Sequence, residues 1–446
     1  MKSELEQHTE PAGKDRLFTP VFIILIAASL CCFVTGQGLN AGTSVYISRL
    51  GGTATLAGVG ALVFSVSALV GRIASGPLAD TRGRRIVMLV GVVILFAGTF
   101  GTAVAGNVDL MMLWRALQGL GFSCVTTAAA TAAADVLPAE RLGEGIGYYG
   151  LAQAFAMTIG PALGIALVMV DPPETLYWGL TLVVAVAFVL TLFCRYEKHP
   201  ERLPLTATYR ERMKAAGPGG AGGEGASLRT ATSDASAESD AQEGKGAVAR
   251  LIAMFAAPGA LAGGIPILFF APAAGFEIYF IGLLGNDLQI GNGGFFFTVS
   301  AITMILVRVS SKAFMDRVPA LKVYAVAIAA GLVCFAIMFC ATLHLVEGVA
   351  LQALFYGSGM FYGVCFGLAL PVNQAVAVKN SPAEKWGAAN GLFLLLFDLG
   401  MGVSSVIWGV TNDLFGFSFT IGCVVVLLAV SFAAACIVYP PFAKRG

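Results

Sequence analysis

Long apolar stretches, separated by short polar or Gly/Pro-rich breaks, run through most of this 446-residue chain. A helix needs about 20 residues to cross the roughly 30 Å hydrocarbon core of a membrane, and each stretch is about that long or longer. Twelve stretches can be counted, at residues 18–46, 53–76, 86–105, 109–134, 145–170, 175–194, 251–284, 293–315, 321–344, 349–378, 386–410 and 417–439. The pattern predicts an all-α integral membrane protein with twelve transmembrane helices.

The basic residues between these stretches predict their orientation. Of the 27 Lys and Arg residues, 24 lie in the two chain ends, in the middle insert and in the loops and span ends of one side. The opposite loops contain only Arg49, while Arg72 and Arg115 lie within predicted spans. Because Lys and Arg are retained in the cytoplasm, we expect residues 1–17 and 441–446 to be cytoplasmic ends of a multi-pass protein in the plasma membrane, which in bacteria is the inner membrane.

Residues 195–250 differ from the rest of the chain because they begin with charged residues and continue as a run rich in Ala, Gly and Ser. Such a composition cannot bury enough apolar surface to offset its ordering entropy. We therefore expect a flexible cytoplasmic linker between an N-terminal six-helix bundle at 18–194 and a C-terminal one at 251–440. A regulatory or partner-binding loop is the alternative.

The two halves also resemble each other in sequence. Two local matches support this: residues 137–143 with 381–387, and Arg72 and Asp80 with Arg308 and Asp316. A repeat of six spans in the same direction is typical of a transporter built from two pseudo-symmetric bundles, with its substrate site between them near the membrane midplane.

Composition excludes several classes of protein. The chain has 57% hydrophobic and 12% charged residues and a mean hydropathy of +0.82. These values exclude an ordinary soluble protein. The net charge of +1 gives no indication of a nucleic-acid partner. There is no phosphate-binding loop of the G-x-x-x-x-G-K-[ST] type, no CxxC pair and no histidine cluster, so we expect no enzyme, no cofactor and no metal site. Active transport would then have to use an ion gradient.

The loop after the second span carries the first family resemblance. Residues 76–85 read GPLADTRGRR and resemble the G-x-L-a-D-r-x-G-r-r loop of the major facilitator superfamily. Glycines permit a tight turn there. The resemblance implies a conformational latch in which the loop aspartate pairs with neighbouring arginines and with a helix N-terminus. The residues it assigns to this latch are Gly76, Asp80, Arg82, Gly83, Arg84 and Arg85.

The fourth span contains a second motif of that superfamily. Residues 113–121 read LWRALQGLG and resemble its l-x-x-R-x-x-q-G pattern, which places Arg115 and Gln118 inside the span. An arginine in a membrane span is costly and should face the protein interior. In proton-coupled members the resemblance implies a role for this arginine in proton transfer. A structural partner of backbone carbonyls is the alternative.

The fifth span resembles the g-x-x-x-G-P-x-x-G-G motif of drug:proton antiporters through Gly160, Pro161 and Gly164, although Ala156 and Ile165 replace two glycines. Small residues allow close helix contact, and proline removes an intrahelical hydrogen bond. The resemblance implies an exporter, and a pure packing role is the alternative.

Two carboxylates are well separated from the predicted loops. Asp398 lies twelve residues after the start of its span at Trp386, about 18 Å into the membrane at 1.5 Å per residue. Glu277 lies in the outer part of the seventh span. Carboxylates inside membranes are functional candidates by default, so we expect Asp398 to carry a proton or bind a cation. For Glu277, a place at a cavity mouth or lipid interface is nearly as plausible as substrate contact. A hydrogen-bonded packing role is the alternative for Asp398, and Glu277 is the rival candidate for proton coupling.

Amide and aromatic side chains within the spans are candidates for substrate contact. They are Gln37, Asn40, Gln118, Gln153, Asn373, Gln374 and Phe397.

The sequence thus predicts proton-coupled efflux of a small amphipathic compound by alternating access, with protons, the substrate and the lipid bilayer as partners and a monomer as the functional unit. Proton-coupled uptake of a nutrient such as a sugar, organic acid or peptide is one alternative. A non-transporting receptor or scaffold that acts through the linker is the other.

Overall fold

The structure is a computed structural model that describes residues 17–105, 107–198, 203, 206–210, 258–315, 317–382 and 386–439. The expected chain ends at 1–16 and 440–446, most of the 195–250 insert and the start of the seventh span at 251–257 lie outside these residues.

Six long helices form the first half. They are α1 (Pro20–Arg49), α2 (Ala54–Arg82), α3 (Arg84–Val104), α4 (Val108–Val136), α5 (Leu142–Val168) and α6 (Thr175–Phe193), with the short 3-10 helix η1 (Ala139–Arg141) before α5. The side chains of Thr19, Thr53 and Asn107 cap α1, α2 and α4, each by accepting a hydrogen bond from a backbone N–H of the first turn. These caps satisfy donors that the helix itself leaves free.

The second half contains α9 (Pro258–Asp287), α10 (Gly294–Met315), α11 (Ala320–Thr342), α12 (Gly348–Lys379) and α13 (Trp386–Val438). The backbone of α13 leaves the helical conformation at Gly416, where φ is 77° and ψ is 176°. This α13 therefore consists of two helices joined at a bend, and they correspond to the predicted eleventh and twelfth spans. Only glycine adopts such a conformation without steric cost.

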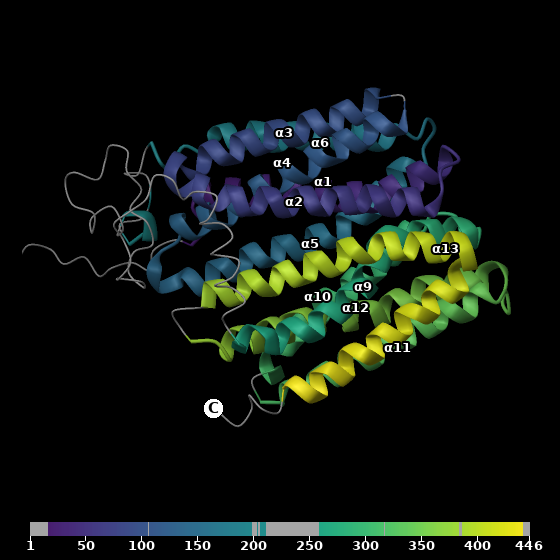
Figure 1. Ribbon diagram of the computed structural model, residues 1–446. Helices are drawn as coiled ribbons and strands as arrows, with labels where there is room; N and C mark the ends of the chain where they lie inside the picture. Colours follow the sequence, from purple (N-terminus) through teal and green to yellow (C-terminus); the bar gives the residue numbers. More distant parts are fainter. Residues whose placement is uncertain are drawn as a thin grey trace, which may run out of the picture.

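The two halves lie side by side, with α1–α6 and α9–α13 forming separate groups (Figure 1). Helices α2 and α13, α5 and α10, and α1 and α9 meet at the boundary between them. We call the side where α2, α4, α6 and α12 end the linker side, and the side where α1, α5 and α9 end the far side. The prediction of an all-α fold with two six-helix bundles is confirmed.

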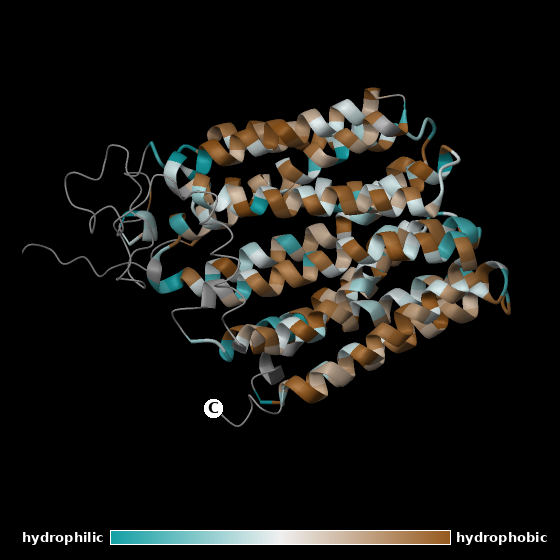
Figure 2. Cartoon of the chain, viewed as in Figure 1, coloured by the Kyte–Doolittle hydropathy of each residue, from teal (hydrophilic) through white to brown (hydrophobic). Residues whose placement is uncertain are grey.

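Apolar residues cover the middle of the helices, and polar residues gather at their ends (Figure 2). Within the described chain, nine helices are long and apolar enough to cross a membrane, and the last of them runs through both parts of α13. This distribution is that of a multi-pass membrane protein.

The segment after α6 packs against the linker side of the first half. The carboxylate of Glu197 accepts hydrogen bonds from the backbone N–H of Arg84 (2.6 Å) and Arg85 (3.4 Å) at the start of α3. The backbone N–H of Thr208 donates to the Leu137 carbonyl oxygen at 3.0 Å. The described part of the predicted linker therefore extends the packed first half beyond residue 194, as far as residue 210.

Candidate functional site

Helices α2 and α13 run antiparallel along one boundary between the halves, and small residues let them approach closely. A β-carbon on Gly402 would lie 2.8 Å from Cβ of Ser65. The hydroxyl of Ser405 donates a hydrogen bond of 2.9 Å to the carbonyl oxygen of Gly58. We call the contact formed by these four residues the α2/α13 seam. Close approach of small residues is a common way to join helices in membranes.

On the far side this seam ends at Asp413. Its carboxylate accepts hydrogen bonds from the backbone N–H groups of Ala54 (3.0 Å) and Thr55 (2.8 Å), the first residues of α2. A β-carbon on Gly409 would lie 2.6 Å from the Ala54 carbonyl oxygen. A carboxylate of the second half therefore caps a helix of the first half, a favourable position for a negative charge.

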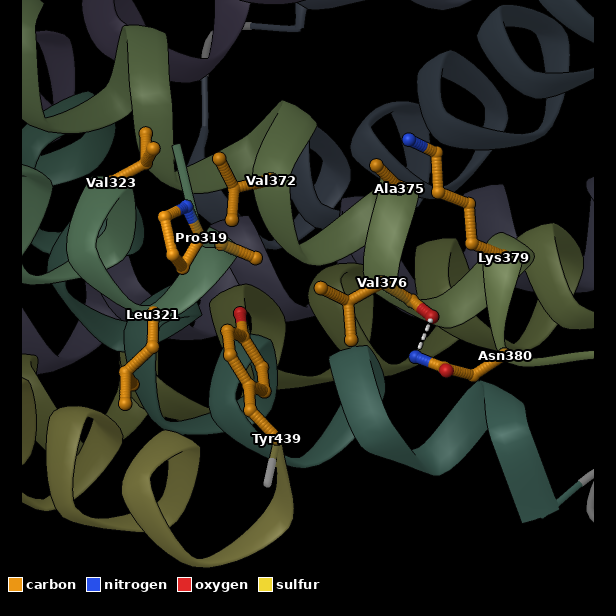
Figure 3. Close-up of a pocket in the computed structure, with 10 residues that line it drawn as sticks. Pro319, Leu321, Val323, Val372, Ala375, Val376, Lys379, Asn380 and Tyr439 are labelled. Atoms are coloured by element: carbon orange, nitrogen blue, oxygen red, sulfur yellow. Dashed lines mark hydrogen bonds between the residues drawn. The ribbon is translucent and has the colours of Figure 1, made fainter. Parts of the chain in front are cut away.

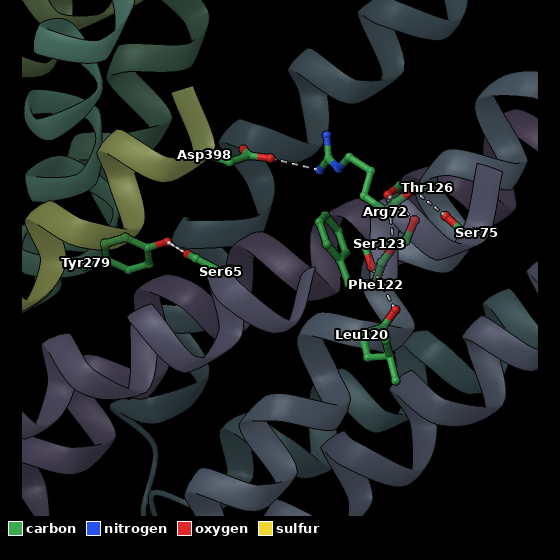
Figure 4. A network of polar contacts seen from close by, with 9 residues as sticks. All are labelled: Ser65, Arg72, Ser75, Leu120, Phe122, Ser123, Thr126, Tyr279 and Asp398. Atoms are coloured by element: carbon green, nitrogen blue, oxygen red, sulfur yellow. Dashed lines mark hydrogen bonds and ion pairs between the residues drawn. The ribbon is translucent and has the colours of Figure 1, made fainter. Parts of the chain in front are cut away.

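Toward the linker side the seam ends in an ion pair. Nη2 of Arg72 lies 3.4 Å from Oδ2 of Asp398, and the two side chains are 35% and 31% exposed (Figure 4). Arg72 belongs to α2 and Asp398 to α13, so the pair joins the two halves. Asp398 is therefore neither a lone carboxylate nor a fully buried one.

Two further contacts close the far side. A β-carbon on Gly294, at the start of α10, would lie 3.0 Å from the carbonyl oxygen of Ala162 in α5. One on Gly282 of α9 would lie 2.5 Å from a methyl carbon of Val45 in α1. All four residues belong to the far-side parts of their helices. The four residues of the α2/α13 seam also lie on the far side of the ion pair.

The linker-side part of α5 is packed less tightly. Gly143, Gly147 and Gly150 share one face of this helix, and among the described residues no atom outside the adjoining helix backbone lies within 4 Å of a β-carbon built on any of them. The halves are thus held together on the far side, and α5 has a glycine face with open space near the linker side.

Arg115 is fully buried within the first half. Its guanidinium donates to Oε1 of Gln118 (3.0 Å), Oδ1 of Asn40 (3.1 Å) and the carbonyl oxygen of Gly60 (3.4 Å). Its Cζ lies 4.7 Å from the centre of the Phe64 ring, a favourable place for a cation. Three predicted site residues therefore meet in one network, in which neutral oxygen atoms satisfy the guanidinium.

Tyr279 links this region to the second half. It belongs to α9, and its hydroxyl lies 3.4 Å from the hydroxyl of Ser65 in α2 (Figure 4). The same tyrosine is close enough to Arg115 and to Asp398 to interact electrostatically with both. An aromatic side chain of the second half is therefore close to both charged groups.

Glu277 lies inside the second half rather than at a cavity mouth. Its exposed fraction is 8%, and it lies close to Tyr362 of α12 and Cys334 of α11. Within the described residues, no lysine or arginine forms an ion pair with it. Burial of an ionised carboxylate without a cation is costly.

The remaining amides of the first half differ in their surroundings. Gln37 of α1 is half-buried, and its Oε1 is buried without a hydrogen-bond partner. Gln153 of α5 is half-buried near Tyr149, whose hydroxyl donates to Ser29 at 3.3 Å. Gln37 thus retains an acceptor that no residue in the described part of the chain uses.

In the second half, Asn373 is fully buried and accepts a hydrogen bond of 2.9 Å from Tyr439. Gln374 donates to Oδ1 of Asn390 at 2.7 Å, which joins α12 to α13. Phe397 is buried, with its ring centre 6.2 Å from that of Phe366. Asn373 and Phe397 therefore belong to the interior of the second half, and Gln374 lies at a helix contact.

In the predicted latch loop, the side chain of Asp80 lies outside what the structure describes, and Arg82 is exposed. Nε of Arg84 lies 2.7 Å from Oδ2 of Asp135 at the end of α4. Arg85 donates to the carbonyl oxygen of Leu192 in α6 at 3.2 Å. Both arginines thus bind within the first half.

Tyr196 also approaches Asp135, with its hydroxyl 3.5 Å from the carboxylate. Burial raises the pKa of Tyr196 well above its usual range, so the hydroxyl remains a neutral donor.

Of the two predicted loop glycines, Gly83 lies between α2 and α3 with a positive φ of 91°, which favours glycine. Gly76 lies within α2, and no described residue would contact a β-carbon built on it.

The predicted motif of the fifth span packs α5 against α1. A β-carbon on Gly160 would lie 2.7 Å from Cβ of Gln37, and one on Gly164 would overlap the carbonyl group of Gly38. Pro161 lies between them within the helix. The motif therefore forms a contact inside the first half.

Sequence reasoning missed Arg72 and Ser65 as site residues. Arg72 had a signal, because an arginine within a span needs a partner. Ser65 had none, because its contact with Tyr279 depends on how two distant helices face each other.

Comparison with known proteins places this geometry in a family. The family model described as Major Facilitator Superfamily matches residues 22–351 and 278–446. The chain is 31% identical over 187 residues to multidrug resistance protein MdtG of Escherichia coli O6:K15:H31, which covers 39% of this chain and 44% of that protein. It is 24% identical over 148 residues to quinolone resistance protein NorA of Staphylococcus aureus, and this match covers 33% of this chain and 38% of that protein. The chain thus aligns with less than half the length of these relatives.

Solved structures agree on the fold. A D-xylose-proton symporter has a TM-score of 0.70 at 14% identity, covering 94% of this chain and 97% of its own. A bacterial homologue of the human lysosomal transporter Spinster, in an inward-facing and unoccupied conformation, has a TM-score of 0.69 at 15% identity. This match covers 95% of this chain and 97% of that one.

Proposed function

Because this chain belongs to the Major Facilitator Superfamily, and is therefore a transporter and not an enzyme, we propose that it exports a small amphipathic compound in exchange for protons by alternating access. The alternative of a non-transporting receptor or scaffold is not retained. The observation that carries the proposal is the ion pair between Arg72 and Asp398, because it joins the halves that must separate during transport.

Asp398 is proposed as the proton-binding group. A proton on its carboxylate removes the charge that attracts Arg72 and so weakens one tie between α2 and α13. When the pair forms again, the proton is released. Both side chains are partly exposed, and the proposal requires that water reach them, because proton exchange depends on it. Proton binding and separation of the halves would thus be coupled at a single site.

Glu277 is proposed as a second proton-binding group. It is more deeply buried than Asp398, and a carboxyl group without a cation is accommodated in a membrane most easily when it holds a proton. Arg115 is proposed to act through its network with Asn40 and Gln118, which holds a fixed positive charge near the boundary between the halves.

Gln37, Gln153 and Gln374 are proposed as substrate contacts because they are half-buried, and Gln37 has an unused acceptor. The linker side is proposed to be cytoplasmic, the membrane to be the plasma membrane and the functional unit to be a monomer. The latch role of Asp80 also remains a proposal.

Export is favoured by the names of MdtG and NorA, which describe resistance to multiple drugs and to quinolones. Uptake is the other candidate. The D-xylose-proton symporter shares the fold at 14% identity, and a fold alone does not set the direction of transport.

The direct test uses everted vesicles with an acidic interior and a panel of amphipathic compounds. For an exporter, a transported compound added outside the vesicles should dissipate the proton gradient, and Asp398→Asn should abolish this response. Glu144→Gln is a matched control, since Glu144 pairs with Arg141 at 2.9 Å within one half. This variant should retain activity.

Dissipation only when the compound is loaded inside the vesicles would identify an uptake symporter instead. Full proton-driven transport by Asp398→Asn would remove Asp398 from the mechanism and make Glu277 the leading proton-binding candidate.

A further inference from the structure

An apolar crevice of about 460 Å³ opens at the linker side of the second half (Figure 3). The start of α11, the end of α12 and the end of α13 enclose it. Its walls include Pro319, Leu321, Val323, Val372, Val376 and Tyr439. This volume falls in the range of about 300 to 1,000 Å³ that is typical of small-molecule sites.

The polar groups at the walls are already satisfied by the protein. The hydroxyl of Tyr439 donates to Asn373 at 2.9 Å, so its ring faces the crevice as an apolar surface. The amide of Asn380 donates to the carbonyl oxygen of Val376 at 2.8 Å, as Figure 3 shows. The crevice therefore suits a hydrocarbon chain, which needs no hydrogen-bonding partner.

The rim of the crevice is basic. Lys379 is exposed and lines the crevice, and Lys322 is exposed between two lining residues of α11. Arg317, also exposed, lies just before Pro319. In the sequence around these helix ends, the basic residues Arg317, Lys322, Lys379 and Lys385 outnumber the acidic residues Asp316 and Glu384. These positions are helix ends, where the hydrocarbon core of a membrane gives way to its headgroups.

We propose that this crevice binds one anionic phospholipid from the leaflet on the linker side, with an acyl chain between α11, α12 and α13 and the phosphate at Lys379 and Lys322. Each basic residue near an anionic membrane surface contributes roughly a fivefold gain in binding. The site lies within the second half, away from the α2/α13 seam, and its occupancy is independent of the direction and substrate of transport.

The test is native mass spectrometry of the full-length protein, purified in detergent and mixed with dioleoyl phosphatidylglycerol or dioleoyl phosphatidylcholine. The wild type should retain the anionic lipid preferentially. Lys379→Gln should lower that preference about fivefold and leave phosphatidylcholine retention unchanged. Ala375→Leu, which places a larger side chain in the crevice, should lower retention of both lipids. Lys198→Gln, an exposed lysine of the first half on the same side, is the matched control and should behave as wild type.

Equal retention of the two lipids by the wild type would overturn the proposal, as would an unchanged preference in Lys379→Gln. A truncation of residues 440–446 that increases retention of both lipids would assign the crevice to the chain's own C-terminal end instead.

Discussion

The contact between Arg72 and Asp398 allows a quantitative prediction. At 3.4 Å, two unit charges attract each other by roughly 5 kcal/mol at an effective dielectric constant of about 20. Because the side chains are 35% and 31% exposed, desolvation and screening should reduce the net contribution to about 1 kcal/mol. That energy corresponds to roughly a fivefold change in an equilibrium between joined and separated helices.

The prediction is tested with a double-mutant cycle of Arg72→Gln and Asp398→Asn in the full chain. Each single variant leaves one charge unpaired, so its loss of unfolding free energy in a denaturant titration should exceed that expected for the pair alone. The double variant should lose less than the sum of the single variants, by about 1 kcal/mol. Gradient-driven transport should be absent wherever Asn replaces Asp398.

A cycle of Arg141→Gln and Glu144→Gln provides the comparison, because that pair lies within one half. It should show coupling in stability without a transport defect. Additive effects of Arg72→Gln and Asp398→Asn, within about 0.5 kcal/mol, would refute the idea that this contact holds the halves together.

Three further predictions concern other contacts. Gly164→Val should overpack α5 against Gly38 and lower unfolding free energy by about 1 to 3 kcal/mol in a denaturant titration, whereas an unchanged value would contradict the close approach. Glu197→Gln should weaken the N-terminal cap of α3 by about 1 kcal/mol, seen as a lower melting temperature, and an unaltered melting temperature would exclude this role. Asp413→Ala should remove the tie to the start of α2 and speed maleimide labelling of a cysteine placed at Ser65, whereas an unchanged labelling rate would show that Asp413 does not close the far side.

The spans were predictable because membrane insertion leaves a direct trace in the sequence. An apolar run must be long enough to cross the hydrocarbon core, and the break between residues 410 and 417 contains Gly416, where α13 bends. The packing of the segment after α6 was not predictable in this way. Tyr196, Leu203 and Ala207 are isolated apolar residues in a polar context, so no periodic pattern marks them as buried.

The site was only partly predictable. Asp398 and Arg115 stand out because charges are rare in spans, but their partners depend on the rotation and register of distant helices. Arg72 is 326 positions before Asp398 in the chain, and nothing local to either residue specifies the pairing. The burial of Glu277 was also not predictable from the sequence, because it depends on how α11 and α12 pack against α9.

The boundaries between the two halves differ chemically, although the halves share a repeated architecture. The contact of α2 with α13 contains Asp413 at one end and the Arg72 pair at the other. The described contact of α5 with α10 rests on the close approach of Ala162 and Gly294. If Asp398 binds a proton as proposed, protonation would loosen the first boundary and leave the second in place. In alternating access the two boundaries would then have different parts, because α2 and α13 would separate on protonation while α5 and α10 stay in contact as the pivot between the halves.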